Sequence, residues 1–299
     1  MSAPLALLVT GGKGQLGSEV AAAGDAAGAG LVRAPGSAEL DVTDGQQVRD
    51  AVASLVRDAG GLRPVVVNAA AYTAVDDAET DSERAYQVNA IGPGLLASAC
   101  AELSVPLLHV STDYVFDGLG SRPYEPPDPT GPRSAYGRTK LAGERAVLSS
   151  AARAHVVRTA WLYGAVGNNF VKSMARLQRS RPTLSVVDDQ RGSPTWSADL
   201  AAGLVELAAA ADRLRPGVLH CVNGGETTWF GFARAVFEEL GADPSRVTPC
   251  SSEQFPRPAP RPAYSVLSVA AWRSAGLTPL RDWRSALAAA FTRHRMALA

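Results

Sequence analysis

Residues 5–20 read LALLVTGGKGQLGSEV, and this stretch decides the fold class. An apolar, strand-like run leads into closely spaced glycines, and a helical pattern begins directly after them. Such glycines permit a tight turn and a close approach of the backbone to a pyrophosphate, which the amides at the start of the helix attract. We therefore expect a strand–loop–helix unit that binds a dinucleotide. The predicted cofactor-binding residues of this loop are Gly11, Gly14, Gln15, Leu16 and Gly17.

Further along the chain, short β-branched apolar runs alternate with alanine-rich helical stretches. The predicted strands are residues 5–11, 31–35, 64–71, 106–113 and 155–164. The predicted helices lie near residues 15–28, 44–59, 79–104 and 134–150. Near-continuous apolar strands that alternate with helices indicate a parallel sheet covered on both faces, and right-handed crossovers make it a doubly wound, Rossmann-type α/β fold. Ligands of such sheets bind beyond the carboxyl ends of the strands.

After about residue 165 the pattern loosens. LSVVDDQ (184–190) and VLHCVNG (218–224) are predicted strands, and residues 198–211 and 229–240 are predicted helices. The proline-rich stretch 253–265 is interpreted either as a linker or as a long loop that wraps a ligand. We expect a dinucleotide-binding domain over residues 1–165 and a smaller substrate-binding domain over 166–299, with some of its segments returning to the first domain.

The composition is that of an ordinary folded protein. The chain has 299 residues, of which 46% are hydrophobic and 19% charged. Its 29 basic and 29 acidic residues balance without any basic block, so we expect neither nucleic acid nor a membrane as a partner. No segment approaches the roughly 20 apolar residues of a membrane span, and the N-terminal apolar run is too short for a signal sequence. Three widely spaced cysteines are typical of reduced thiols in a cytoplasmic protein.

A tyrosine and a lysine stand four residues apart in SAYGRTK (134–140). On a helix, Tyr136 and Lys140 would share one face. A nearby ammonium lowers the pKa of a phenol, which is otherwise about 10, and so suits the phenol to proton transfer near neutral pH. The spacing alone also fits two solvated residues on a helix surface. However, only three of the 29 basic residues are lysines, so a lysine here indicates a site that needs a compact ammonium.

The predicted strand 106–113 ends in three polar residues, Ser111, Thr112 and Asp113. Their hydroxyl and carboxylate groups would lie at the edge of the sheet where ligands bind. Such residues also cap turns, which is the structural alternative. Because a buried strand ends here in three polar residues, and a glycine loop lies upstream, we favour function and interpret Tyr136 as a proton donor.

The end of the second predicted strand bears on the choice of cofactor. An acidic residue about 20 positions after the glycines would hold a ribose 2′-hydroxyl, whereas an arginine would accommodate a 2′-phosphate. Arg33 and Ser37 come early in this segment, and Glu39 and Asp41 come later. We expect NADPH, with NADH tolerated. Arg33 is interpreted either as the phosphate-binding residue or as a solvated surface cation.

Several segments resemble one known family when they are taken in order. They run from residue 10 to about 200 and read TGGKGQLG, NAAAYTAVDDAE, VSTDYVFDG, PYEPPDPTGPRSAYGRTKLAGE, RTAWLYG, NNF and DDQRGSPT. They are similar to motifs of the dTDP-4-dehydrorhamnose reductases, a family of extended short-chain dehydrogenases/reductases, and RPAYSVLS (261–268) resembles the family's C-terminal element. The resemblance implies NAD(P)H-dependent reduction of the C4 keto group of dTDP-4-dehydro-L-rhamnose to dTDP-L-rhamnose, for rhamnose-containing cell-wall or surface polysaccharide.

The resemblance also implies roles for individual residues. Thr112, Tyr136 and Lys140 match the catalytic triad. Tyr136 would protonate the C4 oxygen and Thr112 would hydrogen-bond it, while Lys140 would bind the nicotinamide ribose and lower the pKa of Tyr136. Further cofactor contacts would come from Asp41, Val42, Ala69, Ala70, Ala71 and Tyr72. Further contacts to the dTDP-sugar would come from Asp113, Trp161, Asn169 and Arg261.

Some features depart from the family pattern. Tyr264 and Ser268 stand where the family usually has asparagine and aspartate, which leaves the nucleotide specificity open. Some members depend on magnesium through glutamates, but only Glu19 matches one of these, so magnesium stays open and no metal site is predicted. A homodimer is one option for the oligomeric state. The alternative functions are a non-catalytic NADP-binding subunit of a methionine adenosyltransferase, and another sugar-nucleotide reductase, epimerase or dehydratase.

Overall fold

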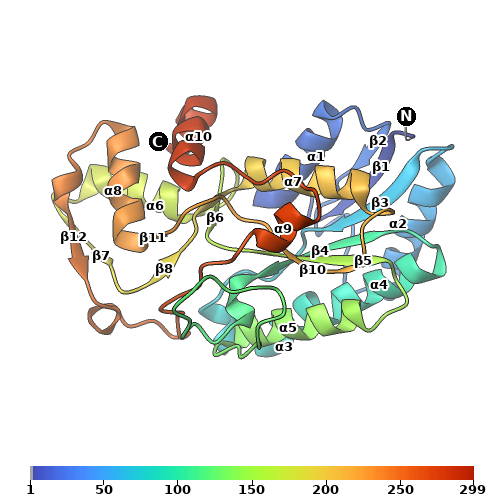
Figure 1. Cartoon of the computed structure of the whole chain (residues 1–299), viewed down its shortest axis with the longest axis horizontal. Coiled ribbons are helices and arrows are strands. Elements are labelled where there is room, and N and C mark those ends of the chain that lie inside the picture. The colour runs from blue at the N-terminus through green and yellow to red at the C-terminus, as the bar shows by residue number, and fades with distance from the viewer. Residues whose placement is uncertain (1–2) are drawn as a thin grey trace.

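The computed structural model describes residues 3–299, and its centre is a six-stranded sheet in the order β10-β5-β4-β3-β1-β2 (Figure 1). Every neighbouring pair of strands is parallel. The strands are β1 (Leu5–Thr10), β2 (Leu31–Arg33), β3 (Arg63–Asn68), β4 (Leu107–Thr112), β5 (Ala154–Thr159) and β10 (Gly217–His220). The predicted doubly wound α/β fold is therefore confirmed.

Helices cover both faces of this sheet, as its apolar strands require. Side chains of β1 alternate between the two faces: Leu7 and Val9 belong to one hydrophobic core and Ala6 and Leu8 to the other. The first core is covered by α1 (Gln15–Ala26), α7 (Ser197–Ala210) and α9 (Ala270–Ser274). The core on the opposite face of the sheet, the second-face core, is covered by α2 (Gly45–Asp58), α4 (Gly92–Glu102) and α5 (Ala135–Leu148).

The topology brings the ends of several strands to one edge. In the register, Thr10 lies opposite Asn68, and Thr112 lies opposite Thr159. The chain leaves β1 for β2 on one side and returns to β3 on the other, so the loops after β1 and β3 diverge. A crevice for ligands opens where the strand order reverses in this way.

The predicted helix 79–104 is interrupted, which the sequence did not indicate. The segment contains η1 (Asp77–Glu79), α3 (Ser82–Tyr86), the π-helical η2 (Gln87–Ile91) and then α4. The wide π turn holds Asn89, whose fully buried side chain bonds to residues outside the helix. The predicted strand 155–164 also ends early, because Trp161 has a left-handed backbone (φ 46°) after Thr159.

A separate hydrophobic core, the second core, lies beyond the carboxyl edge of the sheet and belongs to neither of its faces. It is built from α6 (Phe170–Ser180), α8 (Trp229–Leu240) and α10 (Trp283–Leu298). Short strand pairs accompany these helices: β6 (Leu162–Tyr163) with β9 (Thr195–Trp196), β7 (Leu184–Val187) with β12 (Val247–Cys250), and β8 (Arg191–Gly192) with β11 (Thr227–Thr228). Two 3-10 turns, η4 (Pro244–Arg246) and η5 (Ser252–Gln254), flank β12.

Three C-terminal elements, α7, α9 and β10, pack with the six-stranded sheet rather than with the second core. This agrees with the expected return of some segments, while the division at residue 165 stays a prediction. The proline-rich loop 253–265 runs from the second core back to the sheet edge, where the Tyr264 amide donates to the Gly118 carbonyl at 3.0 Å. No helix within residues 3–299 combines the length and the hydropathy needed to cross a membrane.

Candidate active site

The glycine loop is compact because side chains would not fit in it. A Cβ on Gly12 would lie 2.2 Å from the Ala34 carbonyl oxygen, and one on Gly17 would lie 2.2 Å from the Gly11 carbonyl oxygen. Gly11 itself has a left-handed backbone (φ 67°) and packs against Ala70. These contacts hold the loop between the ends of β1, β2 and β3.

The start of α1 is open to an anion. Its N-cap is Gly14, which offers no side-chain acceptor to the first helical amides. Those amides and the helix dipole favour a negatively charged group at this point. The loop therefore fits the pyrophosphate of a dinucleotide.

Two residues of this loop, Gln15 and Leu16, have side chains that contact other parts of the protein. Leu16 is buried in the first core, so only its backbone faces the loop. The side-chain amide nitrogen of Gln15 (Nε2) donates to the Leu162 carbonyl at 3.2 Å. The side-chain oxygen of Gln15 (Oε1) accepts from Asn169 Nδ2 at 2.9 Å. Asn169 also donates to the Gly164 carbonyl and caps α6 through the Lys172 amide. The hydrogen bonds of Asn169 thus link the glycine loop to the second core, and its role as a substrate ligand stays a prediction.

The segment Ala69–Tyr72 forms a wall beside the glycine loop. Asn68 starts it, accepting from the Thr10 hydroxyl at 2.7 Å and from the Ala70 amide at 3.1 Å. Asn89 holds its end: the Asn89 side chain accepts from the Tyr72 amide at 2.8 Å and donates to the Tyr72 carbonyl at 3.0 Å. The Tyr72 side chain packs in the same cluster as Tyr136. The predicted cofactor wall and the predicted proton donor are therefore neighbours.

The three predicted catalytic residues lie at the end of β4 and in the first turns of α5. Ser134 caps α5 by accepting from the Gly137 amide at 3.1 Å, which fixes where the helix begins. Tyr136 is buried, with Tyr114 packed edge-on at 5.5 Å between ring centroids. Lys140, only 2% exposed, donates to the Val110 carbonyl at 2.7 Å. The structure thus excludes the solvated helix surface that the spacing alone allowed.

The protonation of these groups differs from the expectation. Burial raises the pKa of Tyr136, against the lowering effect of the Thr112 hydroxyl, and Asp113 raises it further. Lys140 makes no contribution to this shift. Burial instead lowers the pKa of Lys140 itself to about 8, although Glu144 opposes this. A phenol with a raised pKa stays protonated, which is the form that a proton donor requires.

Asp113 is the second unusual acid of the site. Its Oδ1 accepts from the Thr112 hydroxyl at 2.9 Å. Burial raises the pKa of Asp113 to about 6, although the hydroxyls of Ser265 and Thr112 beside it act in the opposite direction. Several buried polar atoms here have no hydrogen-bond partner among residues 3–299: Asp113 Oδ2, Ser111 Oγ, Thr159 Oγ1 and Ser265 Oγ. Unpartnered buried polar atoms are rare in folded proteins, and their concentration at a sheet edge indicates a ligand site.

Trp161 lies on the second-core side of the site. Its ring stacks on Trp229 with 3.6 Å between centroids and 5° between planes. Gly192 faces the same ring so closely that a Cβ there would lie 2.4 Å from it. A left-handed backbone at a bulky residue is strained, and such strain is often found at functional sites.

Arg261 connects the two halves of the site. Its guanidinium pairs with the Asp76 carboxylate at 2.9 Å, and Asp76 Oδ1 accepts from the Ala259 amide at 3.2 Å. Asp76 follows the cofactor wall, whereas Arg261 lies in the proline-rich loop. Arg261 also lies near Tyr114, whose pKa it lowers against the larger effect of burial. The loop 253–265 is therefore fastened beside Tyr136 by an ion pair.

The residues predicted for the adenosine end are placed less favourably. Arg33 bonds to Asp58 and to the Ser54 hydroxyl on α2. Asp41 accepts from the amide and hydroxyl of Thr43, so its carboxylate stabilises a turn. Val42 is buried in the second-face core. The side chains of all three residues therefore contact other parts of the protein.

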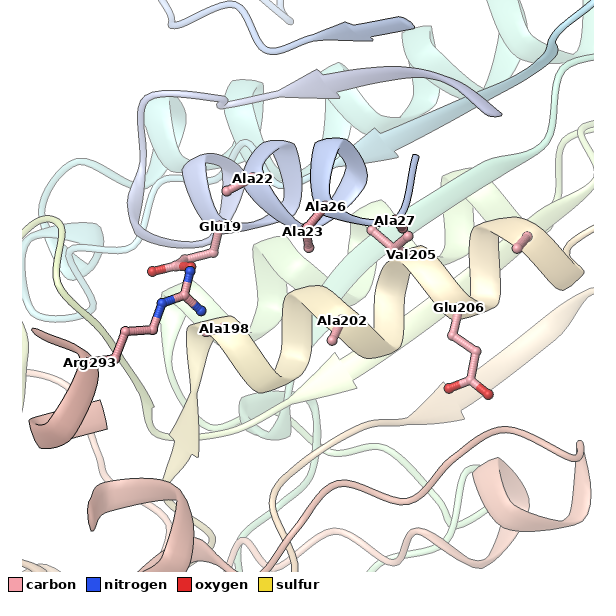
Figure 2. A pocket seen from close by; sticks show the side chains of 11 residues that line it. Glu19, Ala22, Ala23, Ala26, Ala27, Ala198, Ala202, Val205, Glu206 and Arg293 are labelled. Carbon is pink, nitrogen blue, oxygen red and sulfur yellow. The ribbon is translucent and has the colours of Figure 1, made fainter. Parts of the chain in front are cut away.

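The surroundings of Glu19 do not fit a divalent cation within this chain. Glu19 lines a groove of about 530 Å³ between α1 and α7, whose floor is mostly alanine. Figure 2 shows the guanidinium of Arg293 pointing toward the Glu19 carboxylate. His294 Nε2 lies 3.7 Å from the same carboxylate. Within residues 3–299 there is no group of three or more potential metal ligands.

Three residues of the site were missed in the sequence: Asp76, Asn89 and Ser265. Asp76 and Ser265 lie in motifs that resemble the family, but neither ends an apolar strand, which was the signal used to select residues. Ser265 lies 152 positions from Asp113, so only the folded chain brings them together. The signal available for Asn89 was a polar residue at a helix position that the hydrophobic pattern assigns to the core.

Comparisons with known proteins agree with this geometry. The chain matches the family model described as RmlD substrate binding domain over residues 5–296. The dTDP-4-dehydrorhamnose reductase of Mycobacterium tuberculosis H37Rv is 53% identical over 289 residues, which cover 95% of this chain and 91% of that protein. The reductase of the same name from Streptomyces griseus is 52% identical over 288 residues, covering 95% and 92%.

A solved structure extends the comparison to the fold. The crystal structure of dTDP-4-dehydrorhamnose reductase from Bacillus anthracis in complex with NADP has a TM-score of 0.89 to this chain and 35% sequence identity. The match covers 98% of this chain and all of the other. The chain therefore belongs to the RmlD substrate binding domain family, which includes the dTDP-4-dehydrorhamnose reductases, as its motifs predicted.

Proposed function

We propose that this protein reduces dTDP-4-dehydro-L-rhamnose to dTDP-L-rhamnose with NADPH, and that it tolerates NADH. One observation carries the proposal. The Thr112 hydroxyl, the Tyr136 phenol and the Asp113 carboxylate with its free Oδ2 converge at the sheet edge that bears an anion-binding glycine loop. Family membership supports the same reading.

The reaction requires a hydride and a proton at the C4 carbonyl. A bound nicotinamide cofactor supplies the hydride. Tyr136 donates the proton to the C4 oxygen, and its buried phenol holds that proton until negative charge develops there. The Thr112 hydroxyl turns its one proton from Asp113 Oδ1 to the same oxygen and so stabilises the developing charge.

Other side chains orient the reactants. Lys140, one turn after Tyr136, binds the ribose hydroxyls of the cofactor. Asp113 accepts a hydrogen bond from a sugar hydroxyl through the oxygen that has no protein partner. Trp161, whose ring stacks on Trp229 and lies against Gly192, presents its partly exposed edge to the sugar. Because Arg261 is already paired with Asp76, we assign it the positioning of the loop 253–265 around the nucleotide.

We also propose that the protein acts in the cytoplasm. Its three cysteines are free, and two of them are buried in the core. The homodimer stays a prediction, which light scattering coupled to size-exclusion chromatography would test.

The substrate is tested by assaying NADPH oxidation with 4-keto-6-deoxy sugars carried on dTDP, UDP and GDP. We expect one dTDP-L-rhamnose per NADPH consumed, and a clear preference for dTDP. Sugar isomerisation without net cofactor consumption would favour an epimerase. Cofactor binding without any reduction, together with recovery of an adenosyltransferase in a pull-down, would favour the non-catalytic subunit.

A further inference from the structure

Ser265 brings a buried hydroxyl from the proline-rich loop 253–265 into the active site. The residue is only 1% exposed. Its hydroxyl lies beside Asp113: burial raises the pKa of that carboxyl, and the Ser265 hydroxyl acts in the opposite direction. Within residues 3–299, however, neither Ser265 Oγ nor Asp113 Oδ2 completes a hydrogen bond with the protein. Two adjacent buried oxygens of this kind can both be satisfied by one further group that bonds to each of them.

The backbone around Ser265 is held from both halves of the site. On the side of the second core, the Ser265 amide donates to the carbonyl of Arg191 in β8 at 2.8 Å. On the side of the sheet, the amide of Tyr124, in the loop that follows β4, donates to the Val266 carbonyl at 2.9 Å. These bonds fix the Ser265 Cβ, so the hydroxyl can change position only by rotation of the side chain.

The neighbouring side chains of the same segment point to other parts of the protein. The Tyr264 phenol donates to the Glu226 carboxylate at 3.2 Å. Leu267 packs in a hydrophobic cluster beneath the loop. Ser265 is thus the residue through which this segment reaches Asp113.

The chemistry of the two oxygens defines the group that fits both. An ionised carboxylate only accepts hydrogen bonds, whereas a serine hydroxyl can donate one. A group bonded to both must therefore donate to Asp113 Oδ2 and accept from Ser265 Oγ. A hydroxyl does both. A hydrogen atom on carbon does neither, an ether oxygen only accepts and an ammonium only donates.

The position of Asp113 beside Thr112 indicates which sugar hydroxyl this is. In the proposed reaction Thr112 binds the C4 oxygen, and its hydroxyl lies 2.9 Å from Asp113 Oδ1. The Asp113 carboxylate is therefore close to the C4 carbonyl, and its Oδ2 reaches a substituent of a carbon next to C4. In a 4-keto-6-deoxy sugar, C3 carries a hydroxyl, whereas C5 carries only the methyl group and the ring oxygen.

We propose that Ser265 and Asp113 together recognise the C3 hydroxyl of the sugar, with Ser265 as donor and Asp113 as acceptor, and thereby select against 3-deoxy, 3-O-methyl and 3-amino sugars. When Thr112 turns its proton to the C4 oxygen, the C3 hydroxyl replaces it as a donor to Asp113. This inference rests on the proposed function, because it names the substrate group that the site selects.

The experiment compares the binding of dTDP-L-rhamnose and of its 3-deoxy counterpart by calorimetry, with full-length protein saturated with NADP⁺. The variants are Ser265→Ala and Ser265→Cys, the second of which keeps the volume of the side chain. Ser252→Ala is the matched control, because the Ser252 hydroxyl also donates to an aspartate, Asp189, at 2.6 Å, but on an exposed surface.

A single hydrogen bond contributes about tenfold in affinity. We expect wild type to bind dTDP-L-rhamnose at least about tenfold more tightly than the 3-deoxy sugar. Ser265→Ala should weaken dTDP-L-rhamnose by about tenfold and the 3-deoxy sugar by less than about twofold, and Ser265→Cys should change the two affinities in the same directions. Ser252→Ala should leave both affinities unchanged. The values of kcat/KM for the corresponding 4-keto sugars should follow the same pattern.

Three results would overturn the inference. In the first, wild type binds both sugars with equal affinity. In the second, the Ser265 variants weaken both sugars to the same extent, as a merely structural role of the loop would. In the third, Ser252→Ala reproduces the effect of Ser265→Ala. Failure of the proposed function is recognised separately, because the 4-keto sugar would then not be reduced although binding still depends on the C3 hydroxyl.

Discussion

Helix α5 carries two buried charges one turn apart, and their surroundings differ. Both oxygens of Glu144 are bonded by Arg158, at 2.9 and 2.7 Å, and neither side chain is exposed by more than 4%. Lys140 is equally buried but has one neutral partner, the Val110 carbonyl, and burial lowers its pKa to about 8. The difference teaches that burial of a charge does not by itself mark a site. A functional site is marked instead by a buried charge that lacks an ionic partner at the ligand-binding edge of the sheet.

The Glu144–Arg158 pair has an evident structural task. Arg158 also donates to the Pro126 carbonyl at 3.2 Å, and its guanidinium lies over the Phe116 ring. It thereby ties β5 and α5 to the loop that precedes Tyr136. We therefore expect changes to this pair to alter stability, and changes around Lys140 to alter chemistry.

The largest effect is expected for Arg158→Met. It leaves the Glu144 carboxylate buried without a partner, which costs about 3–5 kcal/mol of unfolding free energy. Urea unfolding measures this loss, and the double variant Glu144→Leu/Arg158→Met should regain most of it. Turnover of the single variant, measured at a temperature where it remains folded, should stay within a few-fold of wild type. A loss of turnover without a loss of stability would contradict the structural role of the Glu144–Arg158 pair.

Lys140→Met should show the reverse pattern. Turnover falls by about 100-fold or more, because the group proposed to hold the cofactor ribose is gone. Stability at pH 7 does not fall, because a buried charge is replaced by an apolar side chain of similar length.

The pH dependence of stability provides a control for Lys140. Its pKa in the folded protein, about 8, lies below the ordinary value of 10.5. The charged form therefore destabilises the folded protein below about pH 8, and this cost disappears as pH rises toward 10.5. Wild type should gain stability relative to Lys140→Met between pH 8 and 10. A difference that stays constant over this range would show that Lys140 is not desolvated.

Asp113→Asn should also lower turnover without lowering stability at neutral pH, and the loss of turnover should be smaller than for Lys140→Met. Turnover falls by about tenfold, because the amide is a weaker acceptor for a sugar hydroxyl. Since burial raises the pKa of Asp113 from 3.8 to about 6, wild type loses stability as pH rises through this window. The variant lacks this penalty, so its stability relative to wild type should rise by about 3 kcal/mol between pH 3.5 and pH 7.5. Equal stability of the two proteins at pH 3.5 and at pH 7.5 would contradict the account.

The smallest effect is expected for Asp76→Asn, which weakens a partly exposed ion pair with Arg261. Exposed pairs contribute about 0–1 kcal/mol. The KM for the sugar nucleotide should rise about two- to fivefold while kcat stays unchanged, because only the position of the loop 253–265 is altered. Arg122→Gln, which removes a surface pair with Asp128, is the matched control. An equal rise in KM for both variants would contradict the proposal that Asp76 positions the loop 253–265.

Local sequence patterns were sufficient to predict the layers of the fold. The apolar runs predicted all six strands of the sheet, including β10, and the glycine loop located the anion-binding turn. Thr112, Tyr136 and Lys140 could be selected because each follows a strand end or shares a helix face. These signals depend on residues close in the chain.

Features that depend on distant contacts could not be predicted. The compensation of Arg33 comes from Asp58, 25 positions away on α2, and the Asp76–Arg261 pair joins segments 185 positions apart. The left-handed Trp161 and the π turn around Asn89 are local in extent, but Trp229, Tyr72 and Thr139 stabilise them from other elements. For the same reason, the raised pKa of Tyr136 became visible only when its burial was known.

The central claim is that Tyr136 is the proton donor of a reductase. It is tested most directly by measuring single-turnover reduction of the keto sugar and NADPH affinity in Tyr136→Phe. We predict that NADPH binds within about twofold of wild type, while the rate of reduction falls by at least about 100-fold. Reduction at the wild-type rate, with NADPH still bound, would contradict the account.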